Sequence, residues 1–109
     1  MATLIALEAA HEMARMAFAF AKHIPGGGLR EQLRRAAASV VLNIAEGDAR
    51  GGNDRAALFR IAYASAKEVS AAVRLAGDAE LAAREHVDAL LRALDRVQAL
   101  TWRLACPRH

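Results

Sequence analysis

The chain has 109 residues and a net charge of +3, and 28 residues are alanine, against five aromatic residues and two prolines. Alanine, leucine and arginine favour helices, and the scarcity of β-branched and aromatic residues argues against sandwiches, barrels and parallel α/β folds. A charge of +3 is too small to establish a polyanionic partner by itself. The composition predicts a single all-α domain, and a chain this short is expected to gain stability by associating with its own copies.

No targeting signal is recognisable. The first residues, Met1–Leu4, carry no basic segment, and Glu8 and Glu12 interrupt the apolar stretch that follows, unlike a signal or transit peptide. Charged residues recur too often for a membrane span. Cys106 is the only cysteine, as is typical of a free thiol in a reducing compartment. We therefore expect a cytoplasmic protein with no membrane partner.

Three glycine-containing breaks divide the chain. Pro25–Gly28 cannot continue a helix, and Gly47–Gly52 is followed by residues that can cap the next helix. Gly77 and Asp78 have the pattern of a C′ glycine followed at once by an N-cap, which predicts a tight antiparallel hairpin. Four helices are therefore expected, over residues 4–24, 29–46, 54–76 and 79–104.

The first two expected helices have wider apolar surfaces than packing inside one bundle requires. Over 4–24, two apolar stripes lie side by side, one through Leu4 and Phe18 and one through Met13 and Phe20. Over 29–46, the apolar surface likewise extends beyond its inward-facing stripe. The helix over 79–104 instead opposes its leucines with alternating Arg and Asp, as is typical of a solvent-facing helix. The surplus predicts a second partner for the first two helices.

A line of polar residues follows the second expected helix and meets a shorter one on the third. The members are Arg35, Ser39, Asn43 and Glu46 on the second helix, and Ser65 and Glu68 on the third. Buried or half-buried, these groups need one another as hydrogen-bond partners, and Asn43 is also placed to hold the turn at Gly47. One interpretation is a network that fixes helix register, and we favour it because no nucleophile–base pair or metal set is visible. The other is a small polar site.

These residues carry a resemblance to a known family. Residues 33–47, LRRAAASVVLNIAEG, followed by Arg50, resemble the motif RRAAxSxxxNIAEGxxR. Residues 59–69, FRIAYASAKEV, are similar to a second motif, FxxIAxGSxxEL. The family is that of four-helix-bundle proteins encoded in the intervening sequences of bacterial 23S rRNA genes, together with related accessory proteins of diversity-generating retroelements.

The resemblance implies an up-down-up-down antiparallel four-helix bundle and assembly into a pentameric ring. It also implies that no enzymatic activity is established. The retroelement relatives bind a reverse transcriptase and RNA through a basic surface, which makes both of these expected partners.

Basic residues on the third expected helix are the candidate nucleic-acid contacts. Not counting Asp54, a candidate capping residue, this helix carries four basic residues against Glu68 alone, a local charge equal to the whole excess of the chain, and Tyr63 lies among them. Because Arg60, Lys67 and Arg74 share a heptad spacing, they are expected on one face. Arg30 and Arg34 would add to it if the second and third helices are neighbours. The alternative, which we favour on sequence grounds, is an ordinary solvated face.

Enzyme and metal sites are not expected. Glu8 and His11 form one Glu-x-x-His element, but di-iron bundles need two, and His86 has Ala83 three positions before it. Arg103 and His109 have a spacing found in some helical ribonucleases, yet Pro107 interrupts the helix between them. The sequence predicts a non-enzymatic, self-assembling scaffold or adaptor without cofactors. The alternative is a bundle that binds a metal or small ligand at the polar line between the second and third helices.

Overall fold

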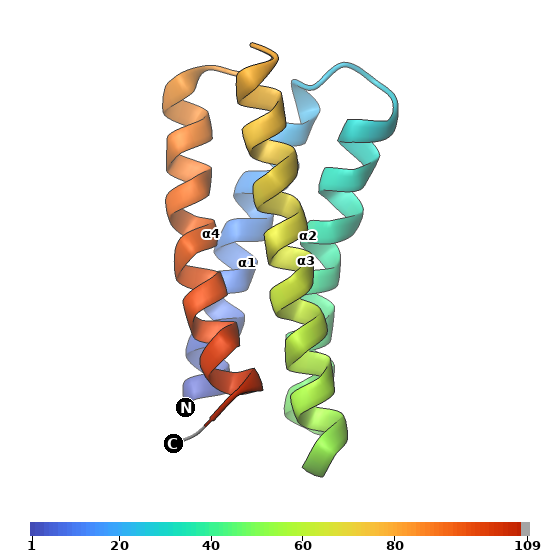
Figure 1. Cartoon of the computed structure of the whole chain (residues 1–109), viewed down its shortest axis with the longest axis vertical. Helices are drawn as coiled ribbons and strands as arrows, with labels where there is room; N and C mark the ends of the chain where they lie inside the picture. Colours follow the sequence, from blue (N-terminus) through green and yellow to red (C-terminus); the bar gives the residue numbers. More distant parts are fainter. Residues whose placement is uncertain (108–109) are drawn as a thin grey trace.

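The computed structural model describes residues 1–107 and consists of four long helices (Figure 1). They are α1 (Ala2–Lys22), α2 (Gly28–Ala49), α3 (Gly52–Asp78) and α4 (Arg84–Ala105). Each helix runs antiparallel to the one before it, and contacts between α1 and α4 close the bundle (Figure 1). The predicted all-α, up-down four-helix bundle is confirmed. None of its helices has the length and apolarity needed to cross a membrane, within residues 1–107.

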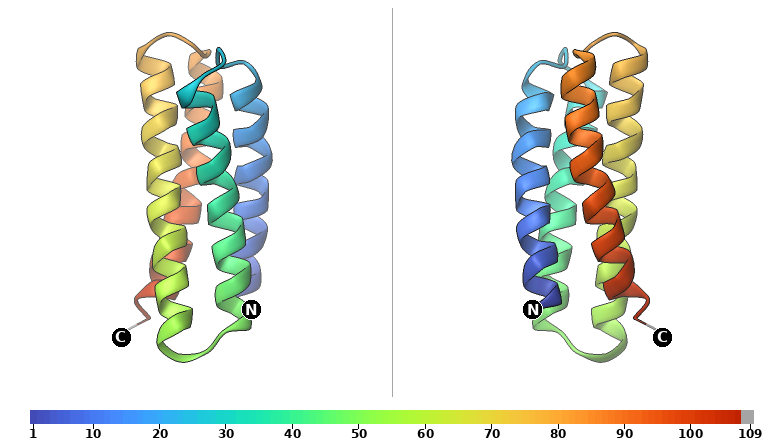
Figure 2. Two further views of the ribbon diagram at one scale, coloured as in Figure 1. Left: turned by 90° about the vertical axis from the view of Figure 1, so that its right-hand side faces the viewer. Right: turned by 90° about the vertical axis from the view of Figure 1, so that its left-hand side faces the viewer.

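Alanine lets the helices approach closely, and larger side chains fill the layers between them. Ala10, Ala37 and Ala62 are completely buried, as are Met13 and Leu94. The contact between α2 and α3 is the most extensive in the bundle, and these two helices lie side by side along their length (Figure 2, left). The contact between α1 and α4 is the least extensive of the four adjacent pairs (Figure 2, right). Flat alanine surfaces account for the close approach of α2 and α3.

Gly47 does not end the second helix, contrary to the sequence-based prediction. It is buried inside α2, which continues to Ala49. A Cβ atom at Gly47 would lie only 2.6 Å from Cε1 of Phe59, so glycine allows the α3 phenylalanine to pack against the α2 backbone. The glycine serves close packing here, and this gain outweighs its poor helix propensity.

The turn between α3 and α4 also differs from the expected hairpin at Gly77 and Asp78. Gly77 is helical and buried against Val87, whose Cγ2 would lie 3.3 Å from an added Cβ. The helix ends in a Schellman motif, in which Leu81 N–H donates to the Ala76 carbonyl and Glu80 N–H to the Gly77 carbonyl. Glu80, with a φ of 60°, occupies the left-handed position that glycine usually takes. The fourth helix therefore begins at Arg84 rather than at residue 79.

Candidate functional site

Five residues of the predicted polar line meet between α2 and α3. The Ser39 and Ser65 hydroxyls are 2.8 Å apart, and Asn43 Nδ2 donates to the carbonyl and hydroxyl oxygens of Ser39, at 2.9 and 3.0 Å. Arg35 donates to Glu68 Oε2 at 2.9 Å, nearer the solvent. We call Arg35, Ser39, Asn43, Ser65 and Glu68 the polar seam. Its groups are partners for one another, which favours its interpretation as a network that fixes the register of α2 on α3.

Glu46 lies outside the polar seam. Its carboxylate pairs with Arg50 at 2.9 Å on the surface, and Arg50 also approaches Asp54 at 3.6 Å. Asn43 does not bond to the backbone at Gly47, because its amide donates back to Ser39. The sequence placed Glu46 on the same line, but three residues beyond Asn43 the α2 surface has already turned toward solvent.

Arg55 holds the end of α2 instead. Its guanidinium donates to the carbonyls of Gly47 and Asp48 at 3.2 and 3.3 Å, and to the Thr3 hydroxyl at 3.0 Å. It also lies over the ring of Phe59, 5.0 Å from the centroid. Sequence reasoning counted Arg55 only as a positive charge. Thr3 is 52 residues away in the chain, and no local sequence pattern predicts a contact over that separation.

The basic charge of the chain is less concentrated on α3 than predicted. Because α3 extends from Gly52 to Asp78, it includes Asp54 and Asp78 as well as Glu68. Four basic and three acidic residues leave α3 with a net charge of +1, and Arg55 is already engaged with backbone carbonyls. The predicted local excess of +3 is wrong because it left out Asp54 and Asp78, which both lie within α3.

Arg30 and Arg34 do not extend the basic residues of α3, although α2 and α3 are neighbours. Arg30 Nε donates to the carbonyl of Ile24 at 3.0 Å, across the α1–α2 connection. The Arg34 guanidinium lies 5.8 Å from the ring centroid of Phe18 on α1. Both contacts belong to the α1 side of α2, whereas the polar seam marks its α3 side.

Three basic residues and two aromatic rings form the remaining candidate surface. Arg60, Lys67 and Arg74 are exposed on α3, and none of them forms an ion pair with another residue of the described part, 1–107. Tyr63 contacts Trp102 of α4, with ring centroids 5.1 Å apart and planes tilted by 52°. Lys67 Nζ lies 5.9 Å from the Tyr63 ring centroid. We call these five residues the basic-aromatic face.

Trp102 is the member that sequence reasoning missed. It is the only tryptophan of the chain, and it is 51% exposed. The signal available in the sequence was its position outside the apolar stripe of the last helix, between Leu100 and Leu104. An exposed indole beside a tyrosine and a lysine offers both a stacking surface and a cation, the two requirements for binding single-stranded nucleic acid.

The residues considered for metal or enzyme chemistry are scattered. Glu8 and His11 are exposed on α1, and Cys106 is exposed after α4. No group of three or more His, Cys, Asp or Glu is arranged to hold a metal ion between residues 1 and 107. His109, whose spacing from Arg103 was considered and set aside on sequence grounds, lies outside the described residues.

Comparison with known proteins identifies the family and supports the fold. No curated protein matches the chain. A crystal structure of a protein of unknown function from the S23 ribosomal protein family of Bacteroides thetaiotaomicron superimposes with a TM-score of 0.90 at 18% identity, over 96% of this chain and 98% of that chain. The model of the 23S rRNA-intervening sequence protein family matches residues 2–103. The chain therefore belongs to the family of 23S rRNA-intervening sequence proteins.

Proposed function

We propose that this chain is a non-enzymatic adaptor of the cytoplasm that self-assembles and binds single-stranded RNA through the basic-aromatic face. The observation that carries the proposal is the contact of Lys67, Tyr63 and Trp102 on the surface of α3 and α4. Stacking of a base on an aromatic side chain contributes about 1–3 kcal/mol, and basic residues beside the rings attract the phosphate backbone.

The exposure of Trp102 supports this interpretation over that of an ordinary solvated face. A solvated face needs only charged and polar groups. Trp102 is half exposed, so the protein loses the favourable free energy of burying that part of the indole. Tyr63 contacts the Trp102 ring from the α3 side, and Lys67 lies over the ring of Tyr63. An arrangement in which a costly aromatic surface is kept beside unpaired cations is typical of a binding surface.

Self-assembly is supported by apolar side chains that the single bundle leaves in solvent. The exposed fraction is 65% for Leu42 on α2, 50% for Leu4 on α1 and 39% for Phe18 on α1. A ring of five copies, as the family resemblance implies, would cover part of this surface and repeat the basic-aromatic face around the assembly. Repetition would raise the avidity for a long RNA without any new contact.

The retroelement relatives give the proposal a second source of support. Residues 33–69 resemble accessory proteins that bind a reverse transcriptase and RNA, and a reverse transcriptase is therefore proposed as a protein partner of the assembled adaptor. The metal- or ligand-binding alternative at the polar seam has less support, because the seam residues already bond to one another.

Charge reversal tests the RNA interaction. We expect the wild-type chain to retain single-stranded RNA at about 50 mM salt, where phosphate contacts are strong, and to release it as salt is raised. Replacing Arg60, Lys67 and Arg74 with glutamate should abolish retention. The matched control replaces Arg92, Arg96 and Arg103, which are exposed on α4 outside the face. Both variants have a net charge of −3, since each changes the wild-type +3 by six units. Equal loss in the two variants, or no retention by the wild type, would contradict the proposal.

A further inference from the structure

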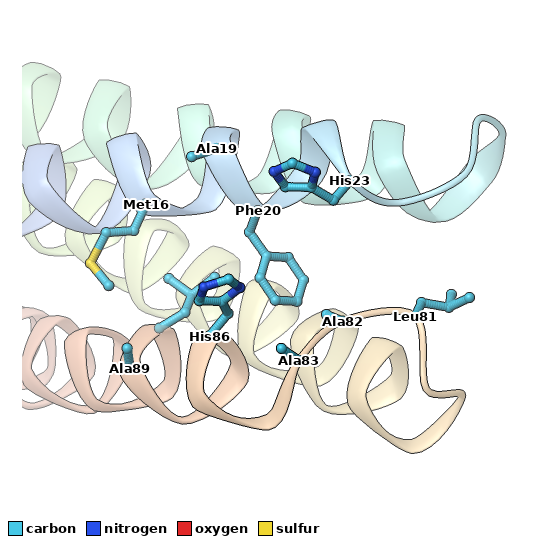
Figure 3. A pocket seen from close by; sticks show the side chains of 10 residues that line it. Met16, Ala19, Phe20, His23, Leu81, Ala82, Ala83, His86 and Ala89 are labelled. Atoms are coloured by element: carbon cyan, nitrogen blue, oxygen red, sulfur yellow. The ribbon is translucent and has the colours of Figure 1, made fainter.

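A pocket of about 520 Å³ lies between α1 and α4, at the end of the bundle where the chain turns from α3 into α4 (Figure 3). Met16 and Phe20 line it from α1 and Leu90 from α4, with residues 81–83 along its rim. This volume falls within the range of about 300–1,000 Å³ that is usual for small-molecule sites. The pocket is distinct from both the polar seam and the basic-aromatic face.

Small side chains keep the pocket open. Ala19 of α1 and Ala89 of α4 both line it, where larger residues would take up part of the space (Figure 3). The same residue type that brings α2 and α3 together therefore leaves α1 and α4, the least extensively packed pair, with a hollow. Phe20 is nearly buried at its base, so the apolar wall is held by the core.

Two imidazoles are the only polar side chains of the lining. His23 follows the end of α1 and His86 lies in the first turn of α4, so the two rings come from opposite sides (Figure 3). No Asp or Glu of residues 1–107 lines the pocket. The C-terminal end of α1 and the N-terminal end of α4 both adjoin the pocket, so the negative end of one helix dipole and the positive end of the other oppose each other there. The imidazoles therefore decide which polar head group of a ligand is preferred. Each ring can donate an N–H to an oxygen anion.

We propose that this pocket binds a small organic anion with an apolar body, such as a medium-chain monocarboxylate. The apolar body packs against Met16, Phe20 and Leu90, and the carboxylate accepts hydrogen bonds from His23 and His86 at the mouth. An apolar enclosure with a few convergent donors is the usual composition of a small-molecule site. The lining favours a carboxylate over an amine, because it offers N–H donors and no acidic group.

Calorimetric titration with octanoate and with octan-1-ol tests the apolar wall and the donors separately. We expect saturable binding of octanoate, at least about tenfold tighter than that of the neutral alcohol. The double variant His23→Phe/His86→Phe keeps ring area at two exposed positions and removes the N–H donors. The double variant should bind octanoate about tenfold more weakly or worse, and it should bind octanol at least as tightly as the wild type does.

A blocking variant tests the position of the site. Ala19→Phe should fill the hollow and abolish binding of both ligands, whereas Ala99→Phe, at an exposed alanine of α4 outside the lining, should bind both like the wild type. Circular dichroism establishes that each variant keeps its helices. The proposal is overturned if the wild type shows no saturable octanoate binding, if Ala19→Phe binds as well as the wild type, or if the double histidine variant binds octanoate unchanged.

Discussion

A single arginine joins three helices at the end of the bundle where α2 turns into α3. Arg55 donates to the carbonyls of Gly47 and Asp48 in the last turn of α2, and to the Thr3 hydroxyl on α1. The Gly47 carbonyl also accepts the N–H of Arg50, so Arg55 adds to the capping of this helix end. Its position over Phe59 links this contact to the close packing of Gly47 against the same ring. The glycine of the NIAEG segment is therefore explained by what the α3 phenylalanine requires.

Gly47→Ala tests this explanation at the scale of one residue. The added Cβ would lie 2.6 Å from Phe59 Cε1, and overpacking of this kind typically costs about 1–3 kcal/mol. The better helix propensity of alanine returns up to about 1 kcal/mol, so we expect a net loss of about 1–2 kcal/mol in the free energy of unfolding. Urea denaturation measures it.

The control is Gly28→Ala, at a glycine of α2 with no atom within 4 Å of the added Cβ. This variant should be as stable as the wild type or slightly more stable. Combining Gly47→Ala with Phe59→Leu should recover part of the loss that the alanine causes, by relieving the clash. A Gly47→Ala protein of unchanged stability would show that the approach of Phe59 is not the reason for glycine.

At the scale of whole elements, the Schellman motif after α3 is built with an unfavourable residue. Glu80 holds a φ of 60°, and the left-handed region costs a residue with a Cβ about 1–2 kcal/mol. The two hydrogen bonds of the motif and the packing of Gly77 against Val87 keep the chain there. The α3–α4 connection is therefore under conformational strain that its sequence does not relieve.

Glu80→Gly should stabilise the protein by about 1 kcal/mol, because glycine adopts the left-handed conformation without steric cost. Thermal unfolding followed by circular dichroism should show a higher Tm. Ala79→Gly is the matched control: with a φ of −84°, Ala79 gains nothing from glycine and should be unchanged or less stable. If the two substitutions have the same effect, the strain assigned to Glu80 is absent.

Most of this architecture follows from the sequence, because helical periodicity and the Pro25–Gly28 break depend on local chemistry. Gly47 and Gly77 were misread as helix ends, since in both cases a contact with a distant side chain decides that glycine stays helical. The polar seam was predictable from its spacing on α2 and α3. The Arg55 contacts and the Tyr63–Trp102 pair were not, because they join residues far apart in the chain.

For the whole molecule, the proposed assembly accounts for apolar surface that the bundle exposes. Leu42 is the most exposed side chain among the large apolar residues inside the helices, on a surface rich in alanine. Burying such surface between copies contributes about 25 cal/mol per Å² of apolar area. A chain with a thin core thereby gains from its copies part of the stability that its length does not supply.

Light scattering coupled to size-exclusion chromatography measures the assembly. We expect a mass of about five times the 11.7 kDa of one chain at micromolar concentration, with Leu42→Glu shifting the population toward smaller species while the helices remain. Ala99→Glu, on an exposed part of α4, should leave the mass unchanged. A wild-type protein that elutes as a monomer would contradict the proposed ring.

The fluorescence of Trp102 reports whether the basic-aromatic face stacks unpaired RNA bases on this side chain. Because Trp102 is the only tryptophan, the indole emission of the whole chain reports on this surface alone. At about 50 mM salt, single-stranded polyuridine should quench the emission saturably, added salt should reverse the quenching, and duplex RNA of equal length should quench much less. Emission that single-stranded RNA leaves unchanged, or that duplex RNA quenches equally, would show that Trp102 does not stack on unpaired bases.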